Sequence, residues 1–246
     1  MTAGGTTGLA GQTVVVIGGS AGIGLETARL ARAEGADVVL TGRTPERLES
    51  AATEVGARST AAFDAHDSAA LERFFGELDG PIDHVLATAG RPYYSTLADM
   101  DFDDVRTALQ EHPLLMLGVA RRAQGLVRPG GSLLFMSGTG GRRTGPGLGI
   151  ISAMTAALPA LTANLAIEIA PIRVNLIAAG FVDTPLSASL LGDQLEARRR
   201  ELRTTLPIGR VVRSDDVASL AVHLMINTAL TGATYDIDGG QQFVFR

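Results

Sequence analysis

The sequence predicts a doubly wound α/β fold, in which helices cover both faces of a parallel sheet, and three observations support this prediction. Short runs of Val, Ile and Leu recur without polar alternation, as in strands that are covered on both faces. Longer segments between these runs carry apolar residues at helical spacing. A glycine cluster marks the first junction between a strand and the helix that follows it. Because strand and helix alternate along the chain, we expect one domain with right-handed crossovers.

Six segments are predicted to be buried strands, each of which ends in a turn. They are 13–19, 37–42, 84–90, 132–138, 172–180 and 233–240. Two long helices are expected at about 101–125 and 151–170. The opening residues MTAGGTTGLA have neither a basic head nor an apolar signal core. We therefore interpret residues 1–10 as a flexible tail and residues 11–246 as the domain.

Composition excludes several classes of protein. The 246 residues are 46% hydrophobic, which allows a large buried core. No apolar run approaches the roughly 20 residues of a membrane-spanning helix, so we expect a cytoplasmic protein without a membrane partner. Cysteine is absent, which excludes disulfides, thiolate chemistry and cysteine-based metal sites, and we predict no metal site. The net charge of -5 argues against a nucleic-acid partner.

The glycine cluster carries the most specific local signal. Gly18, Gly22 and Gly24 lie between a buried strand and a helix, with the spacing GxxxGxG. Glycine allows a tight turn and a close approach of the backbone to a ligand, and the N–H groups at the start of the helix can then bind a pyrophosphate. A tight turn alone would also use glycines. The position between strand and helix favours a dinucleotide site.

The end of the second strand distinguishes between the two nicotinamide cofactors. A carboxylate there would bind the ribose 2′-hydroxyl of NAD, whereas a basic residue accepts the 2′-phosphate of NADP. The chain reads LTGR, with Arg43 and no carboxylate. Arginine can donate two parallel charge-assisted hydrogen bonds to a phosphate, and Ser20 could add a hydroxyl contact. Arg43 could also be a solvated loop charge, but the pattern favours NADP(H).

Several motifs in order resemble those of the short-chain dehydrogenase/reductase family. They are GGSAGIG, TGR, FDAHD, ATAG at 87–90 and PIRVNLIAAGFVDTPL at 171–186, and the likeness runs from about Gly11 to Gln242. The resemblance implies a Rossmann-like doubly wound parallel sheet in a single domain, a nicotinamide cofactor and an oxidoreductase activity. It also implies a homodimer or homotetramer in which the two long helices pair into a four-helix interface.

The resemblance also assigns cofactor contacts to individual residues. Gly18, Ser20, Gly22 and Ile23 would line the pyrophosphate and the adenosine ribose. Asp64 and Ala65 would border the adenine. The remaining contacts are those of Ala89 and Gly90 with the ribose and of Val182 and Thr184 with the nicotinamide carboxamide.

The catalytic residues of that family have no counterparts here. Counting back from PIRVN without a gap puts Ile151 at the family's Tyr, Thr155 at its Lys and Gly138 at its Ser. Isoleucine cannot exchange a proton, and threonine has no charge with which to tune a neighbour's pKa. The chain contains no lysine, and no tyrosine lies between Tyr94 and Tyr235. The catalytic residues therefore stay unknown at this stage.

Other side chains could replace the missing acid, although each also has an ordinary structural reading. His112 could titrate near neutral pH and Glu111 could accept a proton, or both could be plain helix residues. Pro113 should kink that helix. Ser137 and Thr139 could hold a carbonyl oxygen, or serve only the turn in which they lie.

Further residues could reach a substrate. Tyr93 and Tyr94 follow the ATAG turn and are either pocket residues or loop packing. Arg142 and Arg143 lie in a glycine-rich loop, and segment 196–203 falls where the family carries a mobile lid. These cations could attract a carboxylate or a phosphopantetheine tail, or could be solvated surface charges.

Three functions are consistent with this sequence. The first is an NADP(H)-dependent oxidoreductase that acts on a small organic carbonyl or alcohol and takes its proton from substrate or water. The second is a catalytically silent NADP(H)-binding sensor or partner subunit. The third is a non-redox enzyme, such as an isomerase, dehydratase or cyclase. The substrate itself is not indicated.

Overall fold

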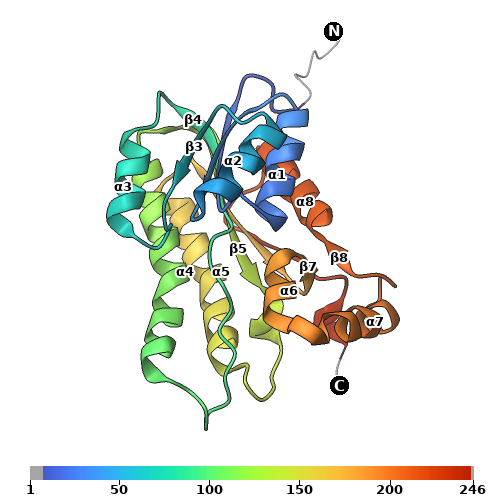
Figure 1. The fold of residues 1–246 in the computed structure, drawn as a ribbon. Coiled ribbons are helices and arrows are strands. Elements are labelled where there is room, and N and C mark those ends of the chain that lie inside the picture. The colour runs from blue at the N-terminus through green and yellow to red at the C-terminus, as the bar shows by residue number, and fades with distance from the viewer. Residues whose placement is uncertain (1–7, 245–246) are drawn as a thin grey trace.

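A seven-stranded parallel sheet forms the centre of the protein, as a computed structural model describes it for residues 8–244 (Figure 1). The spatial order of its strands is β3-β2-β1-β4-β5-β6-β9. The strands are β1 (Thr13–Ile17), β2 (Asp37–Gly42), β3 (Ser59–Ala62), β4 (Ile82–Ala87), β5 (Val127–Gly138), β6 (Arg173–Ala179) and β9 (Thr234–Ile237). The strand order reverses between β1 and β4, where a doubly wound sheet opens a crevice for a ligand. The predicted single-domain fold is confirmed.

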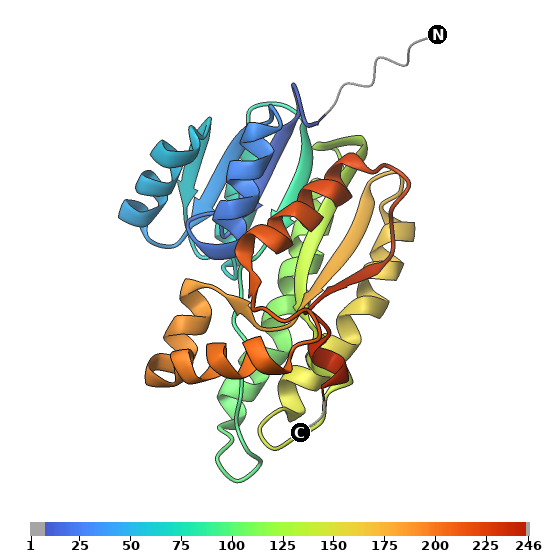
Figure 2. The same ribbon diagram turned by 90° about the vertical axis from the view of Figure 1, so that its right-hand side faces the viewer.

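Six helices cover the two faces of the sheet (Figure 2). One face carries α1 (Gly22–Ala33), α2 (Pro45–Val55) and α8 (Ser214–Ile226). The other carries α3 (Ser68–Gly76), α4 (Phe102–Ala123) and α5 (Gly149–Glu168). Strand β1, with the sequence TVVVI, is buried at every position because its side chains alternate between the two cores.

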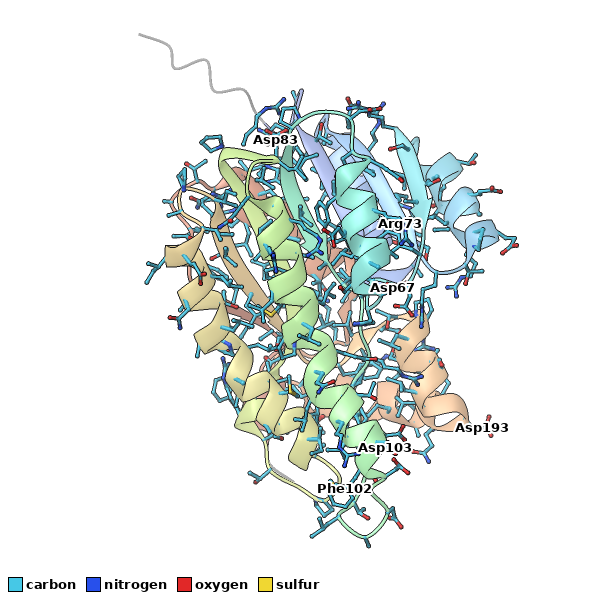
Figure 3. All side chains as sticks on the ribbon, turned by 90° about the vertical axis from the view of Figure 1, so that its left-hand side faces the viewer. Asp67, Arg73, Asp83, Phe102, Asp103 and Asp193 are labelled. Atoms are coloured by element: carbon cyan, nitrogen blue, oxygen red, sulfur yellow. The ribbon has the colours of Figure 1, made fainter. Side chains whose placement is uncertain are left out.

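A smaller unit lies beyond the carboxyl ends of the strands. It consists of α6 (Pro185–Leu191), α7 (Leu195–Thr205), the short pair β7 (Val182–Asp183) and β8 (Val212–Arg213), and the 3-10 turn Gly192–Gln194. Two further 3-10 turns, Thr139–Arg142 and Gln241–Phe243, follow β5 and β9. Figure 3 shows Asp193 at the tip of this unit, and Phe102 and Asp103 at the N-terminal end of α4, which also extends past the sheet. The two extensions flank the ligand-binding edge of the sheet.

Some boundaries differ from those predicted. Leu9 is fully buried, and its N–H donates to the Glu34 carbonyl at 2.9 Å, so the fold begins earlier than residue 11. Residues 1–7 of the predicted tail lie outside the described residues. The helices α4 and α5 are each assigned as one continuous helix through Pro113 and Pro159. Neither proline ends its helix.

Helix α5 is the most apolar helix of the described part of the chain. The helix has 20 residues, and the mean hydropathy of an 18-residue window within it is 1.7, so it is long and apolar enough to cross a membrane, contrary to the expectation that no segment is. Met154, Leu158 and Leu165 of this helix are nevertheless buried against the sheet and α4, as in the core helix of a globular domain. Its outward face also carries apolar residues, among them Ile167, which is 81% exposed.

Candidate cofactor and substrate site

The loop between β1 and α1 is shaped by glycines. Gly18 and Gly22 have φ values of 93° and 55°, in the left-handed region that disfavours side chains. A Cβ atom on Gly24 would lie 2.2 Å from the Gly18 carbonyl oxygen, so the helix can approach the loop only because this residue is glycine. The amides of Gly18 and Gly19 both donate to the Thr41 carbonyl, at 3.2 and 2.9 Å. These bonds hold the loop against the end of β2.

The first turn of α1 is free to bind an anion. Ala21 precedes the helix in an extended conformation, and no side chain caps the N-terminus. No acidic side chain occupies the first turn. The amide groups of this turn therefore keep their hydrogen-bonding capacity and the positive end of the helix dipole. This arrangement suits the pyrophosphate predicted from the sequence.

Arg43 lies next to this loop, immediately after β2. The side chain is exposed and makes no hydrogen bond or ion pair with any residue in 8–244. Ser20 also lies near the end of β2, because its Oγ would be 3.0 Å from a Cβ atom added to Gly42. Asp64 is exposed and accepts a hydrogen bond from the His66 amide at 3.0 Å, while Ala65 is buried. These four residues lie outside the main cavity, on its β2–β3 side.

A cavity of about 570 Å³ opens at the carboxyl ends of the strands, between the sheet and the unit formed by α6 and α7. It brings together seven of the residues that the resemblance assigns to the cofactor. They are Gly18, Gly22, Ile23, Ala89, Gly90, Val182 and Thr184. Thr184 also has a local role, since its Oγ1 accepts from the Ser187 amide at 3.1 Å and caps α6. The volume and the convergence of loops are typical of a small-molecule site.

Gly138, Ile151 and Thr155 line the same cavity. A Cβ atom on Gly138 would lie 3.5 Å from Thr155 Cγ2, so these residues from β5 and α5 are neighbours. The Thr155 hydroxyl donates to the Ile151 carbonyl at 2.8 Å, within its own helix. The side chains at these three positions therefore offer the cavity neither an ionisable group nor a free proton.

Other polar side chains do reach the cavity. The Ser137 Oγ is buried and has no hydrogen-bond partner among residues 8–244, and Thr139 is buried close by in sequence. His112 packs against Gly90, where its Nε2 would lie 2.7 Å from an added Cβ atom. Burial lowers the pKa of His112, as does the nearby His66, while Glu111 raises it. Burial thus favours the neutral form of His112.

Of the two tyrosines in the loop after β4, the cavity includes Tyr94 and not Tyr93. Desolvation raises the pKa of the Tyr94 phenol, and the positive charges of Arg143 and Arg198 lower it. Both guanidinium groups thus lie within electrostatic range of this hydroxyl. Glu111 does not line the cavity.

Two further residues of the site had been assigned no role from the sequence. The Thr88 hydroxyl lies 3.2 Å from the Ile17 carbonyl and 3.1 Å from the Gly18 carbonyl, and so braces the glycine loop against β4. Gln241 comes from the end of the chain, and its Oε1 accepts from the Phe181 amide at 2.7 Å. Both side chains line the cavity. Thr88 lies in the ATAG motif, but its role and that of Gln241 depend on contacts that are distant in sequence.

Comparison with known proteins identifies relatives along almost the whole chain. A family model described as enoyl-(acyl carrier protein) reductase matches residues 18–242. The NADP-dependent (R)-specific alcohol dehydrogenase of Lentilactobacillus kefiri is 31% identical over 250 residues, which cover 94% of this chain and 97% of the relative.

Solved structures agree with this match. A mutant of a Serratia marcescens short-chain dehydrogenase/reductase is 26% identical with a TM-score of 0.86, covering 95% of this chain and 99% of the other. A small-chain dehydrogenase in complex with NADPH is also 26% identical, with a TM-score of 0.81 and coverage of 94% and 99%. The fold, the glycine loop and these matches lead to one conclusion: the chain belongs to the short-chain dehydrogenase/reductase family, whose fold binds nicotinamide cofactors.

Proposed function

We propose that the protein binds NADP(H) and uses it to transfer a hydride to or from a small organic carbonyl or alcohol. The observation that carries the cofactor choice is Arg43, whose guanidinium lies beside the glycine loop and has no partner among residues 8–244. The NADP-dependent alcohol dehydrogenase and the NADPH complex among the relatives support the same choice. When bound, the nicotinamide supplies the hydride chemistry, and the protein supplies binding and orientation.

Each part of the site has a defined task in this proposal. Arg43 and Ser20 bind the 2′-phosphate, and the uncapped first turn of α1 binds the pyrophosphate. Val182 and Thr184 orient the carboxamide of the nicotinamide ring. Ser137, whose Oγ is buried without a partner among the described residues, donates to the substrate oxygen.

The proton donor in this proposal is not a side chain at the usual positions. Ile151 cannot donate a proton, and the Thr155 hydroxyl is bonded to its own helix. We infer that the proton comes from water or from the substrate itself. Positioned acids typically contribute about 10²- to 10⁴-fold, so carbonyl reduction without one is expected to be slow.

The lack of an ionisable side chain at Gly138, Ile151 and Thr155 also favours a second candidate function. A pocket that binds NADP(H) but lacks an acid at Ile151 suits a catalytically silent sensor or partner subunit, or a non-redox enzyme such as an isomerase, dehydratase or cyclase. A panel of ketones, aldehydes and alcohols distinguishes the candidates by the absorbance of NADPH at 340 nm. Turnover of any one class supports the oxidoreductase; no hydride transfer by the cofactor-saturated protein to any class supports the second candidate.

The cofactor choice gives a direct prediction. In a fluorescence titration, NADPH should bind much more tightly than NADH. Replacing Arg43 by Ala should weaken NADPH binding by about 10- to 100-fold, because charge-assisted hydrogen bonds contribute roughly 1.5–3 kcal/mol. The affinity for NADH should change little, since it has no 2′-phosphate.

Arg47→Ala provides the matched control. Arg47 is also exposed and lies in the first turn of α2. Its replacement by Ala changes the net charge by the same amount as Arg43→Ala. NADPH affinity should persist in this variant. Equal affinities of the parent protein for NADPH and NADH would refute the role given to Arg43.

We also propose that the protein is a homodimer or homotetramer, held together through α4 and α5. Leu114 and Leu117 on α4 are 60% and 44% exposed, and Ile167 on α5 is 81% exposed. Figure 3 shows the two helices side by side on one face. Light scattering should give a particle mass of two or four times the chain mass of 25.5 kDa. The double variant Leu114→Glu/Ile167→Glu should have a lower particle mass. A monomeric parent at about 50 µM would contradict this assembly.

A further inference from the structure

Among residues 8–244, the side chains that line the cavity include arginines and no carboxylate. Among the residues that line it, the charged side chains are Arg91, Arg143 and Arg198, and none is Asp or Glu. The chain as a whole has a net charge of -5. Like charges in a partly enclosed space repel one another, so this grouping is costly unless an anion joins it.

The guanidinium groups of Arg143 and Arg198 can each donate further hydrogen bonds. Arg143 is half-buried, and its guanidinium makes no hydrogen bond or ion pair within residues 8–244. Its neighbour Arg142, by contrast, pairs with Asp236. Arg198 pairs with Glu201, at 2.7 Å from Nη1 to the carboxylate. The pKa of Tyr94 responds to both Arg143 and Arg198, which places the two cations near one hydroxyl.

Arg143 lies across the sheet from the residues proposed to bind the 2′-phosphate of the cofactor. Arg143 follows β5 and the 3-10 turn after it, and Arg198 lies on α7. The phosphate-binding groups lie at the ends of β1 and β2, and β2 and β5 are separated by β1 and β4. Three strand spacings correspond to roughly 14 Å across the sheet. An anion at Arg143 is therefore a different group from the cofactor's 2′-phosphate.

The surroundings of the arginines are apolar. Leu148, Leu186 and Leu190 line the same cavity, and Leu186 and Leu190 are 44% and 37% exposed. Such surfaces bind hydrocarbon and reject an isolated ion. The occupant that fits both features has an apolar body and one anionic end.

We propose that the substrate carries a carboxylate or phosphate at the end of an apolar body, and that Arg143 and Arg198 bind this anion while Tyr94 donates a hydrogen bond to it. The guanidinium fork suits both anions, because each offers two oxygens in one plane. The inference rests on the proposed function, since it names the substrate class of that same cavity.

The test compares ligands that share a body and differ in charge. The NADPH-saturated protein is titrated by calorimetry with octanoate, octyl phosphate and the neutral octanamide. We expect at least one anion to bind about tenfold or more tightly than octanamide. In the double variant Arg143→Gln/Arg198→Gln this preference should fall below about threefold, with NADPH affinity retained. The stronger of the two anions identifies the carboxylate or the phosphate as the preferred end group.

The double variant Arg142→Gln/Arg200→Gln is the control, because it removes the same charge from the same loop and the same helix. Neither of these residues lines the cavity, so the preference for an anion should persist. A parent protein that binds NADPH but neither anion better than octanamide would overturn the anion site and leave the proposed function intact. An equal loss of preference in both double variants would also overturn it. Failure to bind NADPH would instead contradict the proposed function.

Discussion

The triple variant Gly138→Ser/Ile151→Tyr/Thr155→Lys is expected to reduce ketones with NADPH about 10²- to 10⁴-fold faster than the parent chain. The new tyrosine would supply a positioned proton, the lysine would lower the pKa of its phenol, and the serine would hold the carbonyl oxygen. The three positions already line one cavity, on adjoining elements β5 and α5. The rate of NADPH oxidation with a panel of ketones measures the gain.

The structure has room for these side chains. A Cβ atom on Gly138 would make only ordinary contacts, at 3.5 Å to Thr155 Cγ2 and to the Ala179 carbonyl. A second cavity of about 160 Å³ lies behind Gly138 and Thr155 and leaves space for a longer side chain at residue 155. The substitutions are therefore expected to preserve the fold.

The decisive control replaces Ile151 by Phe instead of Tyr and keeps the other two changes. This variant has the same ring but no phenolic proton. If both triple variants bind NADPH and reduce ketones no faster than the parent, residue 151 does not face a substrate carbonyl. A parent that is active while the tyrosine variant gains nothing would indicate a pocket that is adapted to other chemistry.

Gly24→Ala is expected to weaken NADPH binding by about 100-fold or more. The added Cβ atom would lie 2.2 Å from the Gly18 carbonyl oxygen and 3.0 Å from Thr88 Oγ1. The first of these neighbours is backbone, so the loop itself has to move. Because the loop and the first turn of α1 together bind the pyrophosphate, a shifted loop loses several hydrogen bonds of roughly 1–3 kcal/mol each. Fluorescence titration measures the affinity, and thermal unfolding shows whether the variant remains folded.

Gly76→Ala serves as the comparison. Gly76 ends α3, and an added Cβ atom there would have no neighbour within 4 Å. This variant should bind NADPH like the parent. Undiminished binding in a folded Gly24→Ala protein would disprove the role of the close approach.

Apolar strands made the fold predictable, and the exceptions have physical reasons. Strand β3 has the sequence STAA at the edge of the sheet, with most of its residues exposed, so no run of Val, Ile or Leu marked it. Strand β5 begins at Val127 and includes Pro129, which ordinarily argues against a strand. The two-residue strands β7 and β8 form only because they pair with each other, and neither has a strand pattern in its own sequence. Backbone pairing of this kind cannot be recognised from the types of residue involved.

The candidate site was predictable only in part. The glycine loop and Arg43 follow from local spacing, because one turn determines their position. The burial of Ser137 Oγ, which has no partner in the described part of the chain, and the contact of His112 with Gly90 depend on packing between β5, α4 and the loop after β4. Gln241 enters the cavity from the last described turn of the chain. Tertiary contacts of this kind cannot be inferred from residue order.

The arginines of the cavity, which no carboxylate joins among the described lining residues, also bear on how activity should be sought. Phosphate and sulfate buffers contain the same kind of anion that unpaired arginines bind, and at tens of millimolar they would compete with a weakly bound substrate. Amines, in contrast, would be repelled by Arg91, Arg143 and Arg198. A substrate screen should therefore use a zwitterionic buffer at low salt and favour organic acids. These conditions limit competition for the arginines and are the most suitable for detecting the reaction of this protein.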